Sequence, residues 1–139
     1  MNFKEYYNEI EYVYGEDIDG ADEDDAYQMA KKHGISVLSD KEIYVVAVSN
    51  DEVVGAIWTA WSSKEFSFDV VVRDDFQGQG LGKKLVEIGI STFDEDKEAY
   101  GDDAIMRLDV INIKMEKMLL KKGFEIESNQ TGHTLMVRK

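Results

Sequence analysis

The feature that most constrains this chain is a set of alternating glycines between a valine-rich segment and a helical pattern. Residues 70–86 read Val-Val-Val-Arg-Asp-Asp-Phe-Gln-Gly-Gln-Gly-Leu-Gly-Lys-Lys-Leu-Val. The valines predict a buried strand, and the apolar positions from Leu81 onward predict a helix. Glycine has no Cβ, so it lets a ligand approach the main chain closely. Free N–H groups at a helix start bind phosphate oxygens, so the segment predicts a site for a diphosphate-bearing cofactor that needs no metal.

The spacing of the glycines excludes two common phosphate-binding loops. A P-loop has four residues between its glycines and then Gly-Lys-Ser/Thr, and a dinucleotide-binding loop has Gly-x-Gly-x-x-Gly. In this chain Gly82 follows Gly80 one residue too soon for the second pattern. A glycine-rich turn that only packs a helix tightly against a strand is the alternative that the residues leave open.

The rest of the chain predicts one domain over residues 1–139, with an α/β fold and a mixed sheet. Apolar periodicity predicts a first helix over residues 3–14 and a second over 22–33, with Gly34 as its C-terminal cap. A meander of three strands is expected over 43–48, 53–61 and 66–72. After the glycines we expect a helix to about residue 93, a loop over 94–103, a strand over 105–110, a helix over 112–122, and strands near 124–128 and 133–138. The last two helices would be crossovers.

The composition excludes several classes of function. The chain has 16 basic and 29 acidic residues, a net charge of -13, which argues against a nucleic-acid partner. This charge suits a cationic amine substrate, although solubility alone would also explain it. The absence of cysteine excludes disulfides, thiolate metal sites and a cysteine nucleophile. The polar N-terminus and the lack of a long apolar run lead us to expect a cytoplasmic protein without a membrane partner, as a monomer or homodimer.

Two blocks of the sequence carry a resemblance to a known family. Gln77, Gly80 and Gly82 match Gln-x-x-Gly-x-Gly, which resembles the pyrophosphate loop of the GNAT superfamily of N-acetyltransferases, although Asp74 stands where the family often has proline. The later block, Leu108 to Phe124, looks like the family's strand, asparagine, helix and Gly-Phe ending. The resemblance covers about residues 40–138. It implies a GNAT-like mixed, mostly antiparallel sheet flanked by helices on both faces.

The resemblance also implies a cosubstrate and the residues that hold it. The chain would bind acetyl-CoA and transfer the acetyl group to a primary amine of an unidentified small molecule or protein. Backbone groups near Val70 and Val72 would pair with the pantetheine arm as a neighbouring strand would, and Asn112 would reach the arm near its thioester end. The pyrophosphate would be held by the backbone of Gln77, Gly78, Gln79, Gly80, Leu81, Gly82 and Lys83. Lys83 and Lys84 are the nearest basic side chains, although lysines on an exposed helix turn are often only solvated.

Amine acetylation requires that a protonated amine first lose its proton. The candidate bases are Glu65 and Asp69, on the strand before the loop, and Asp109, on the later strand; each could instead be structural. The developing oxyanion would be met by a backbone N–H near Val72. Family members often place a tyrosine general acid four residues before the Gly-Phe glycine, and this chain has Leu119 there. A non-catalytic acetyl-CoA-binding sensor or structural module is therefore the alternative function.

Two tryptophans, two histidines and an acidic run are further features of the sequence. Trp58 and Trp61 lie on a predicted strand that could form the floor of an acceptor groove, although aromatic residues on strands usually belong to the core. His33 falls at a predicted helix end, where positive charge suits the helix dipole, and His133 falls near a strand start. No second ligand accompanies either histidine, so neither is expected to bind a metal. The acidic run from Glu16 to Asp25 is either a solvated helix start or the edge of a substrate entrance.

Overall fold

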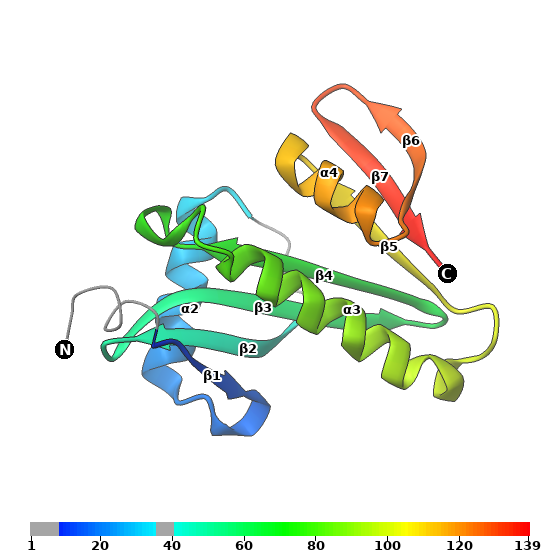
Figure 1. Ribbon diagram of the computed structural model, residues 1–139. Coiled ribbons are helices and arrows are strands. Elements are labelled where there is room, and N and C mark those ends of the chain that lie inside the picture. The colour runs from blue at the N-terminus through cyan, green and yellow to red at the C-terminus, as the bar shows by residue number, and fades with distance from the viewer. Residues whose placement is uncertain (1–8, 36–40) are drawn as a thin grey trace. The chain divides into compact units, whose positions relative to one another are not determined.

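The computed structural model describes residues 9–35 and 41–139 (Figure 1). Its strands are β1 (Glu11–Tyr14), β2 (Glu42–Ser49), β3 (Glu52–Ser62), β4 (Glu65–Val72), β5 (Ile105–Val110), β6 (Glu125–Gln130) and β7 (His133–Arg138). Its helices are α2 (Gly20–Lys32), α3 (Leu81–Tyr100) and α4 (Ile113–Lys121), with short 3-10 turns η1 (Gly15–Asp17) and η3 (Asp74–Phe76). Within the described ranges no helix combines the length and apolar character needed to cross a membrane.

The strands form one sheet in the order β1-β2-β3-β4-β5-β7-β6. β4 and β5 run parallel, with Glu65 opposite Ile105 and Phe66 opposite Met106. The pairs β1–β2, β2–β3, β5–β7 and β6–β7 are antiparallel. The mixed, mostly antiparallel sheet predicted from the sequence is therefore confirmed.

The chain divides into two compact units, one of residues 1–59 and 69–89 and one of residues 60–68 and 90–139. In the first unit, α2 packs on one face of the sheet, around Trp58, which is fully buried and meets the Tyr27 ring edge-on at 5.7 Å. The other members of this core are Ala26, Ala30, Val46, Val53, Ala56 and Val71.

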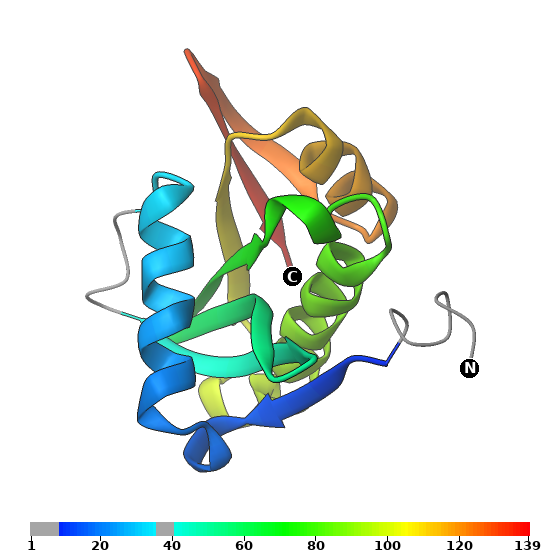
Figure 2. The same ribbon diagram turned by 90° about the vertical axis from the view of Figure 1, so that its left-hand side faces the viewer.

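The opposite face of the same strands carries the start of α3, as Figure 2 shows. Gly55 makes this contact close. A Cβ at residue 55 would lie 3.1 Å from Leu85, 3.2 Å from Leu81 and 3.3 Å from the carbonyl oxygen of Val71. Glycine at this position therefore lets the helix lie directly on the sheet.

In the second unit, an aromatic cluster joins the end of β3 to the C-terminal half of α3. Trp61 stacks on Tyr100 with ring centroids 3.8 Å apart and planes 2° apart, and it also stacks on Phe93. On β5, Met106, Leu108 and Val110 are buried, while the residues between them are more exposed. This alternation places Arg107 and Asp109 on the other face of the strand.

The helix predicted over residues 3–14 is wrong where the structure can be compared. Residues 1–8 lie outside the described part, but Glu11–Tyr14 is strand β1, in which Val13 pairs with Val46. Apolar residues at 10, 13 and 14 fit a helical period, and alternation over so few residues fits a strand equally well. Pairing with β2 decided between the two patterns, because a free strand edge offers backbone hydrogen bonds to an adjacent extended segment.

The loop predicted over residues 94–103 is also wrong in its first part, because α3 continues to Tyr100. Its exposed residues are polar, which led to the loop prediction. The helix is held at two of them: the Tyr100 ring lies on Trp61, and the Asp94 carboxylate accepts from Arg138 at 2.8 Å. The remaining strands and helices agree with the sequence to within a few residues at their ends.

Candidate functional site

The outer end of β4 presents the backbone groups predicted for the pantetheine arm. The N–H of Arg73, directly after the strand, donates to the carbonyl of Val54 on β3 at 2.8 Å. Successive residues of a strand direct their backbone groups to opposite edges. Val71 therefore faces β3 in the same way, and Val70 and Val72 direct their N–H and carbonyl groups to the edge away from β3.

The side chains of the predicted pyrophosphate loop support the loop itself. The amide of Gln77 donates to the carbonyl of Val72 at 3.1 Å, and the amide of Gln79 donates to the carbonyl of Asp75 at 3.1 Å. The Gln77 side chain is thus tied to the end of β4, and the Gln79 side chain to the turn η3. These two amide groups are therefore engaged within the loop, which leaves mainly backbone groups for a ligand there.

The glycines of the loop differ in their backbone conformation and in the space around them. Gly78 and Gly80 have φ of 79° and 86°, in the left-handed region that favours glycine, and a Cβ at either would meet nothing within 4 Å. These two positions therefore shape the backbone and leave open space beside it. At Gly82 a Cβ would lie 3.6 Å from Val72, an ordinary contact.

The loop leads directly into the N-terminus of α3. Lys84 N–H donates to the carbonyl of Gly80 at 3.0 Å, which makes Gly80 the residue that precedes the first helical turn. The N–H groups of Leu81, Gly82 and Lys83 then have no acceptor within the helix. No acidic residue lies in this first turn, and the helix dipole adds positive potential there. The arrangement suits an anionic group of a ligand.

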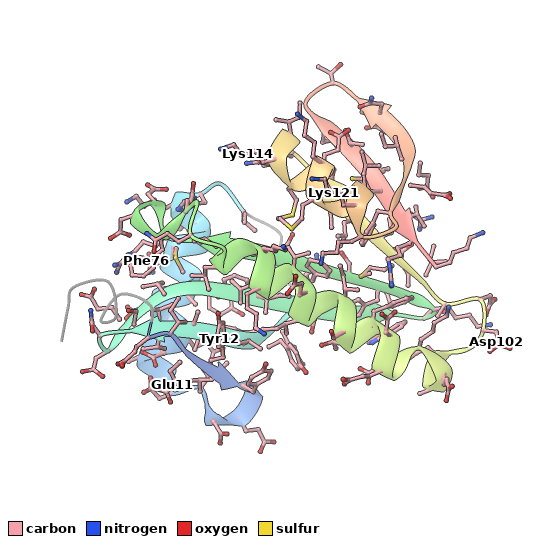
Figure 3. All side chains as sticks on the ribbon, viewed as in Figure 1. Glu11, Tyr12, Phe76, Asp102, Lys114 and Lys121 are labelled. Atoms are coloured by element: carbon pink, nitrogen blue, oxygen red, sulfur yellow. The ribbon has the colours of Figure 1, made fainter. Side chains whose placement is uncertain are left out.

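The turn between β4 and the loop is held by Arg73. Its guanidinium donates to Asp75 at 2.7 and 3.1 Å and to Glu52 at 3.0 Å, and lies 5.0 Å from the centre of the Phe76 ring. Phe76 lies buried beneath the loop (Figure 3). The hydrogen bond from Arg73 lowers the pKa of the Asp75 carboxyl. Asp75 therefore stays ionised and keeps the turn closed at neutral pH.

Asn112 caps α4 in the second unit. Its side-chain oxygen accepts from the N–H groups of Lys114 at 2.8 Å and Met115 at 3.2 Å, and Lys114 extends away from the helix start (Figure 3). The flanking Ile111 and Ile113 are 74% and 69% exposed. The carboxamide oxygen is therefore engaged in a structural role, while the amide nitrogen is the part of Asn112 with donor capacity.

Each of the three candidate bases has a cationic or titratable partner. Glu65 accepts from Arg107, and Arg107 also donates to Glu127 at 3.0 and 2.9 Å. Asp69 lies 3.3 Å from Lys41 in an ion pair, although without the alignment of a hydrogen bond.

Asp109 differs from the other two, because its partner is His133, at 2.6 Å. The hydrogen bond from Arg107 lowers the pKa of the Glu127 carboxyl, so Glu127 is ionised at neutral pH. Glu65 and Asp69 thus form ion pairs with Arg107 and Lys41, although Asp69 Oδ2 is buried without a hydrogen-bond partner. Asp109 instead contacts an imidazole, which can itself accept a proton.

The histidine contacts were not found from the sequence. His33 lies 3.4 Å from Asp74, in the turn before the loop, and His133 contacts Asp109. Pairing β7 against β5 would have revealed the second contact, but the strand register is not readable from one sequence. In the described part of the chain, no group of three potential metal ligands gathers.

Three further predicted positions are apolar or aromatic. Leu119 is fully buried, and its carbonyl accepts from the N–H of Phe124 at 3.0 Å. Trp58 belongs to the core of the first unit, while Trp61 is half-buried in the aromatic cluster of the second. Burial favours a packing role for Leu119 and Trp58.

Comparison with known proteins places the chain among acetyltransferases. Residues 40–126 match the family model described as Acetyltransferase (GNAT) domain. A sequence search of curated proteins gives no match. The solved structures it resembles include a protein from Pyrococcus horikoshii at 22% identity, with a TM-score of 0.67 and coverage of 94% of this chain and 98% of that one.

Two further solved structures carry names that describe an activity or a ligand. The ribosomal-protein-S18-alanine N-acetyltransferase from Escherichia coli is 18% identical, with a TM-score of 0.65 and coverage of 93% and 92%. The PaiA N-acetyltransferase from Thermoplasma acidophilum, in complex with coenzyme A, is 15% identical, with a TM-score of 0.69 and coverage of 94% and 99%. At these identities the structural likeness shows the fold, and the family model shows the family: the chain belongs to the GNAT acetyltransferases.

Proposed function

We propose that this protein transfers the acetyl group of acetyl-CoA to a primary amine. The observation that carries the proposal is the continuity of three features in one segment. The edge of β4 directs the backbone of Val70 and Val72 away from β3, Gly78 and Gly80 of the loop have left-handed φ, and α3 begins with N–H groups that have no acceptor within the helix. This sequence of features suits an extended arm followed by a diphosphate.

Each part of acetyl-CoA is assigned to a different group of residues. The N–H groups of Leu81, Gly82 and Lys83 hold the pyrophosphate, together with the backbone of residues 77–80. Val70 and Val72 pair with the pantetheine arm, and the amide nitrogen of Asn112 binds the arm near the thioester. Acetyl-CoA supplies the activated acetyl group.

The acceptor site must remove a proton from the amine and stabilise the oxyanion. A lysine-like amine has a pKa of about 10.4, so about one molecule in 2,500 is neutral at pH 7. A backbone N–H near Val72 donates to the oxygen that becomes negatively charged. The net charge of -13 favours the approach of a cationic acceptor.

A non-catalytic module that binds acetyl-CoA is the second candidate function. The observation in its favour is Leu119, which is apolar and fully buried where relatives often have a tyrosine general acid. A thiol has a pKa of about 8.5, so coenzyme A leaves tolerably well as a thiolate. The missing acid therefore reduces the rate without abolishing the reaction, and we place catalysis first.

The test is a release assay for free coenzyme A thiol, run with acetyl-CoA and a panel of polyamines, amino acids, aminoglycosides and peptides. Turnover with at least one amine class is the expected result. The melting temperature is measured in parallel, because acetyl-CoA at a hundred times its Kd stabilises the fold by about 2.7 kcal/mol. Stabilisation without turnover supports the non-catalytic module. The absence of both stabilisation and turnover would contradict both functions.

A further inference from the structure

The pairing of β5 with β7 brings Asp109 and His133 together on one face of the sheet. Asp109 lies opposite Leu135, so His133, two residues earlier on β7, is its diagonal neighbour on the same face. His133 Nδ1 lies 2.6 Å from Asp109 Oδ1. The side chains are 32% and 58% exposed, so solutes reach the pair.

We propose that His133 is the general base of the acetyl transfer and that Asp109 is its positioning residue, an inference that rests on the proposed function. An ionised carboxylate only accepts hydrogen bonds, so the Nδ1 atom that contacts Asp109 carries the hydrogen. Nε2 is then the atom of the neutral ring with a lone pair. The carboxylate fixes both the tautomer and the ring orientation.

The position of the pair within the second unit supports this role. Asp109 lies near the C-terminal end of β5, three residues before Asn112, to which the proposed function assigns the thioester end of the arm. The two other candidate carboxylates are committed to Arg107 and Lys41. The imidazole is thus the group at this end of β5 that accepts a proton without breaking an ion pair to a permanent cation.

Other charged side chains on this face of the sheet are bound to one another through Arg107. Arg107 shares the face of β5 with Asp109 and is bound to Glu65 of β4 and Glu127 of β6. On β6, the residue opposite His133 is the uncharged Gln130. The acidic neighbours are neutralised in part by Arg107, and Asp109 makes the direct contact with the ring.

The reaction balances with this assignment. His133 Nε2 takes one proton from the ammonium group of the acceptor, and the nitrogen lone pair forms the C–N bond to the thioester carbonyl carbon. The C–S bond breaks when the carbonyl re-forms, and the electron pair leaves with sulfur. The acylated nitrogen loses a second proton. One of the two protons converts the thiolate to free coenzyme A, and the other is released to water from the imidazolium.

The test uses the full chain with the amine that gives turnover, and compares His133→Gln and Asp109→Asn with His33→Gln. His33 is also paired with an aspartate, at 3.4 Å from Asp74, so it is a matched control. We expect His133→Gln to lower kcat about 10²-fold without changing the Kd for acetyl-CoA. Its pH–rate profile should lose its ascending limb, and added imidazole should restore part of the rate. Asp109→Asn should lower kcat less and displace the limb, and His33→Gln should change neither.

Three outcomes overturn the inference. Turnover by His133→Gln with full kcat and an intact limb shows that another group is the base, and leaves the proposed function standing. A lower kcat that follows a lower melting temperature, with no rescue by imidazole, shows that the contact is only structural. If the unmodified chain neither binds nor turns over acetyl-CoA, the proposed function itself fails and the base assignment falls with it.

Discussion

The backbone N–H of Arg73 donates to the carbonyl of Val54 at 2.8 Å, and this bond determines which edge of β4 each residue faces. Because backbone groups alternate along a strand, Val72 faces the edge that the proposed function gives to the pantetheine arm. A single hydrogen bond between neighbouring strands therefore selects the residues that are available to a ligand.

Val72→Pro removes the N–H group at that edge without removing a donor to β3. One hydrogen bond contributes about 1 kcal/mol, so we expect the Kd for acetyl-CoA to rise about fivefold. Titration calorimetry measures this change. Val71→Pro is the matched control, because its missing N–H faces β3 and the variant should lose stability instead. Equal affinity in Val72→Pro and the unmodified chain would contradict the assigned edge.

Gly80→Val tests the loop that precedes α3. Left-handed backbone costs a residue with a Cβ about 1–2 kcal/mol, and valine methyl groups would fill the space beside the loop. We expect a lower melting temperature and the loss of stabilisation by acetyl-CoA. Gly132, with φ of 85° and open space around a Cβ, lies in the β6–β7 turn. Gly132→Val should therefore lose similar stability but keep its response to acetyl-CoA; a normal response in Gly80→Val would refute the loop assignment.

Leu119→Tyr distinguishes packing from catalysis at the position of the missing acid. The side chain is fully buried, so the larger ring should overpack α4 against the sheet and cost about 1–3 kcal/mol. Leu120→Tyr, at a neighbouring position that is 45% exposed, should cost little. Melting temperature and kcat against pH are measured for both. A stable Leu119→Tyr with a higher kcat below about pH 8 would show instead that residue 119 faces the thioester.

Asp22→Asn tests the acidic start of α2. Burial, and then the charges of Asp19, Asp25 and Asp51, raise the pKa of the Asp22 carboxyl. A carboxyl with a raised pKa in the folded state opposes folding when it is charged, so the substitution should raise the melting temperature modestly at pH 7. This gain should disappear as the pH falls below about 4, where the carboxyl is protonated in both states. Asp24→Asn, at an exposed position on the same helix, should show a smaller gain, and an equal gain would point to net charge alone.

How far the sequence predicts this fold depends on how many residues carry each pattern. The strands of the meander and the helices α2 and α4 follow from long patterns with clear ends, such as Gly34 and Gly123, both of which have positive φ. Residues 11–14 carry too few positions to separate a helical from an extended pattern. Their conformation is decided by the edge of β2, to which they pair. Pairing with another strand is a tertiary interaction, so the local sequence pattern does not reveal it.

The same distinction applies to the site. The glycine loop is local, so its conformation and its position before α3 were predictable. The partners of the candidate bases are not local: Arg107 meets Glu65 from 42 positions away, and His133 meets Asp109 from 24 positions away. Sequence reasoning treated each of these side chains alone. Only the register of β5 against β7 shows that an aspartate and a histidine form one unit.

Substitution of Gly55 should change the affinity for coenzyme A, although this residue is not part of the proposed binding site. A Cβ at this position would lie only 3.1–3.3 Å from Leu81 and Leu85 of α3 and from the carbonyl oxygen of Val71 on β4, so even alanine fits only if these neighbours shift by a few tenths of an ångström. A shift of Leu81 or Leu85 would displace the start of α3, whose N–H groups the proposed function assigns to the diphosphate. Residue 55 thus sets how closely α3 packs on β3, and glycine allows the closest packing. A library selected only for tighter binding of coenzyme A should keep glycine at residue 55, which is not among the residues of the proposed binding site.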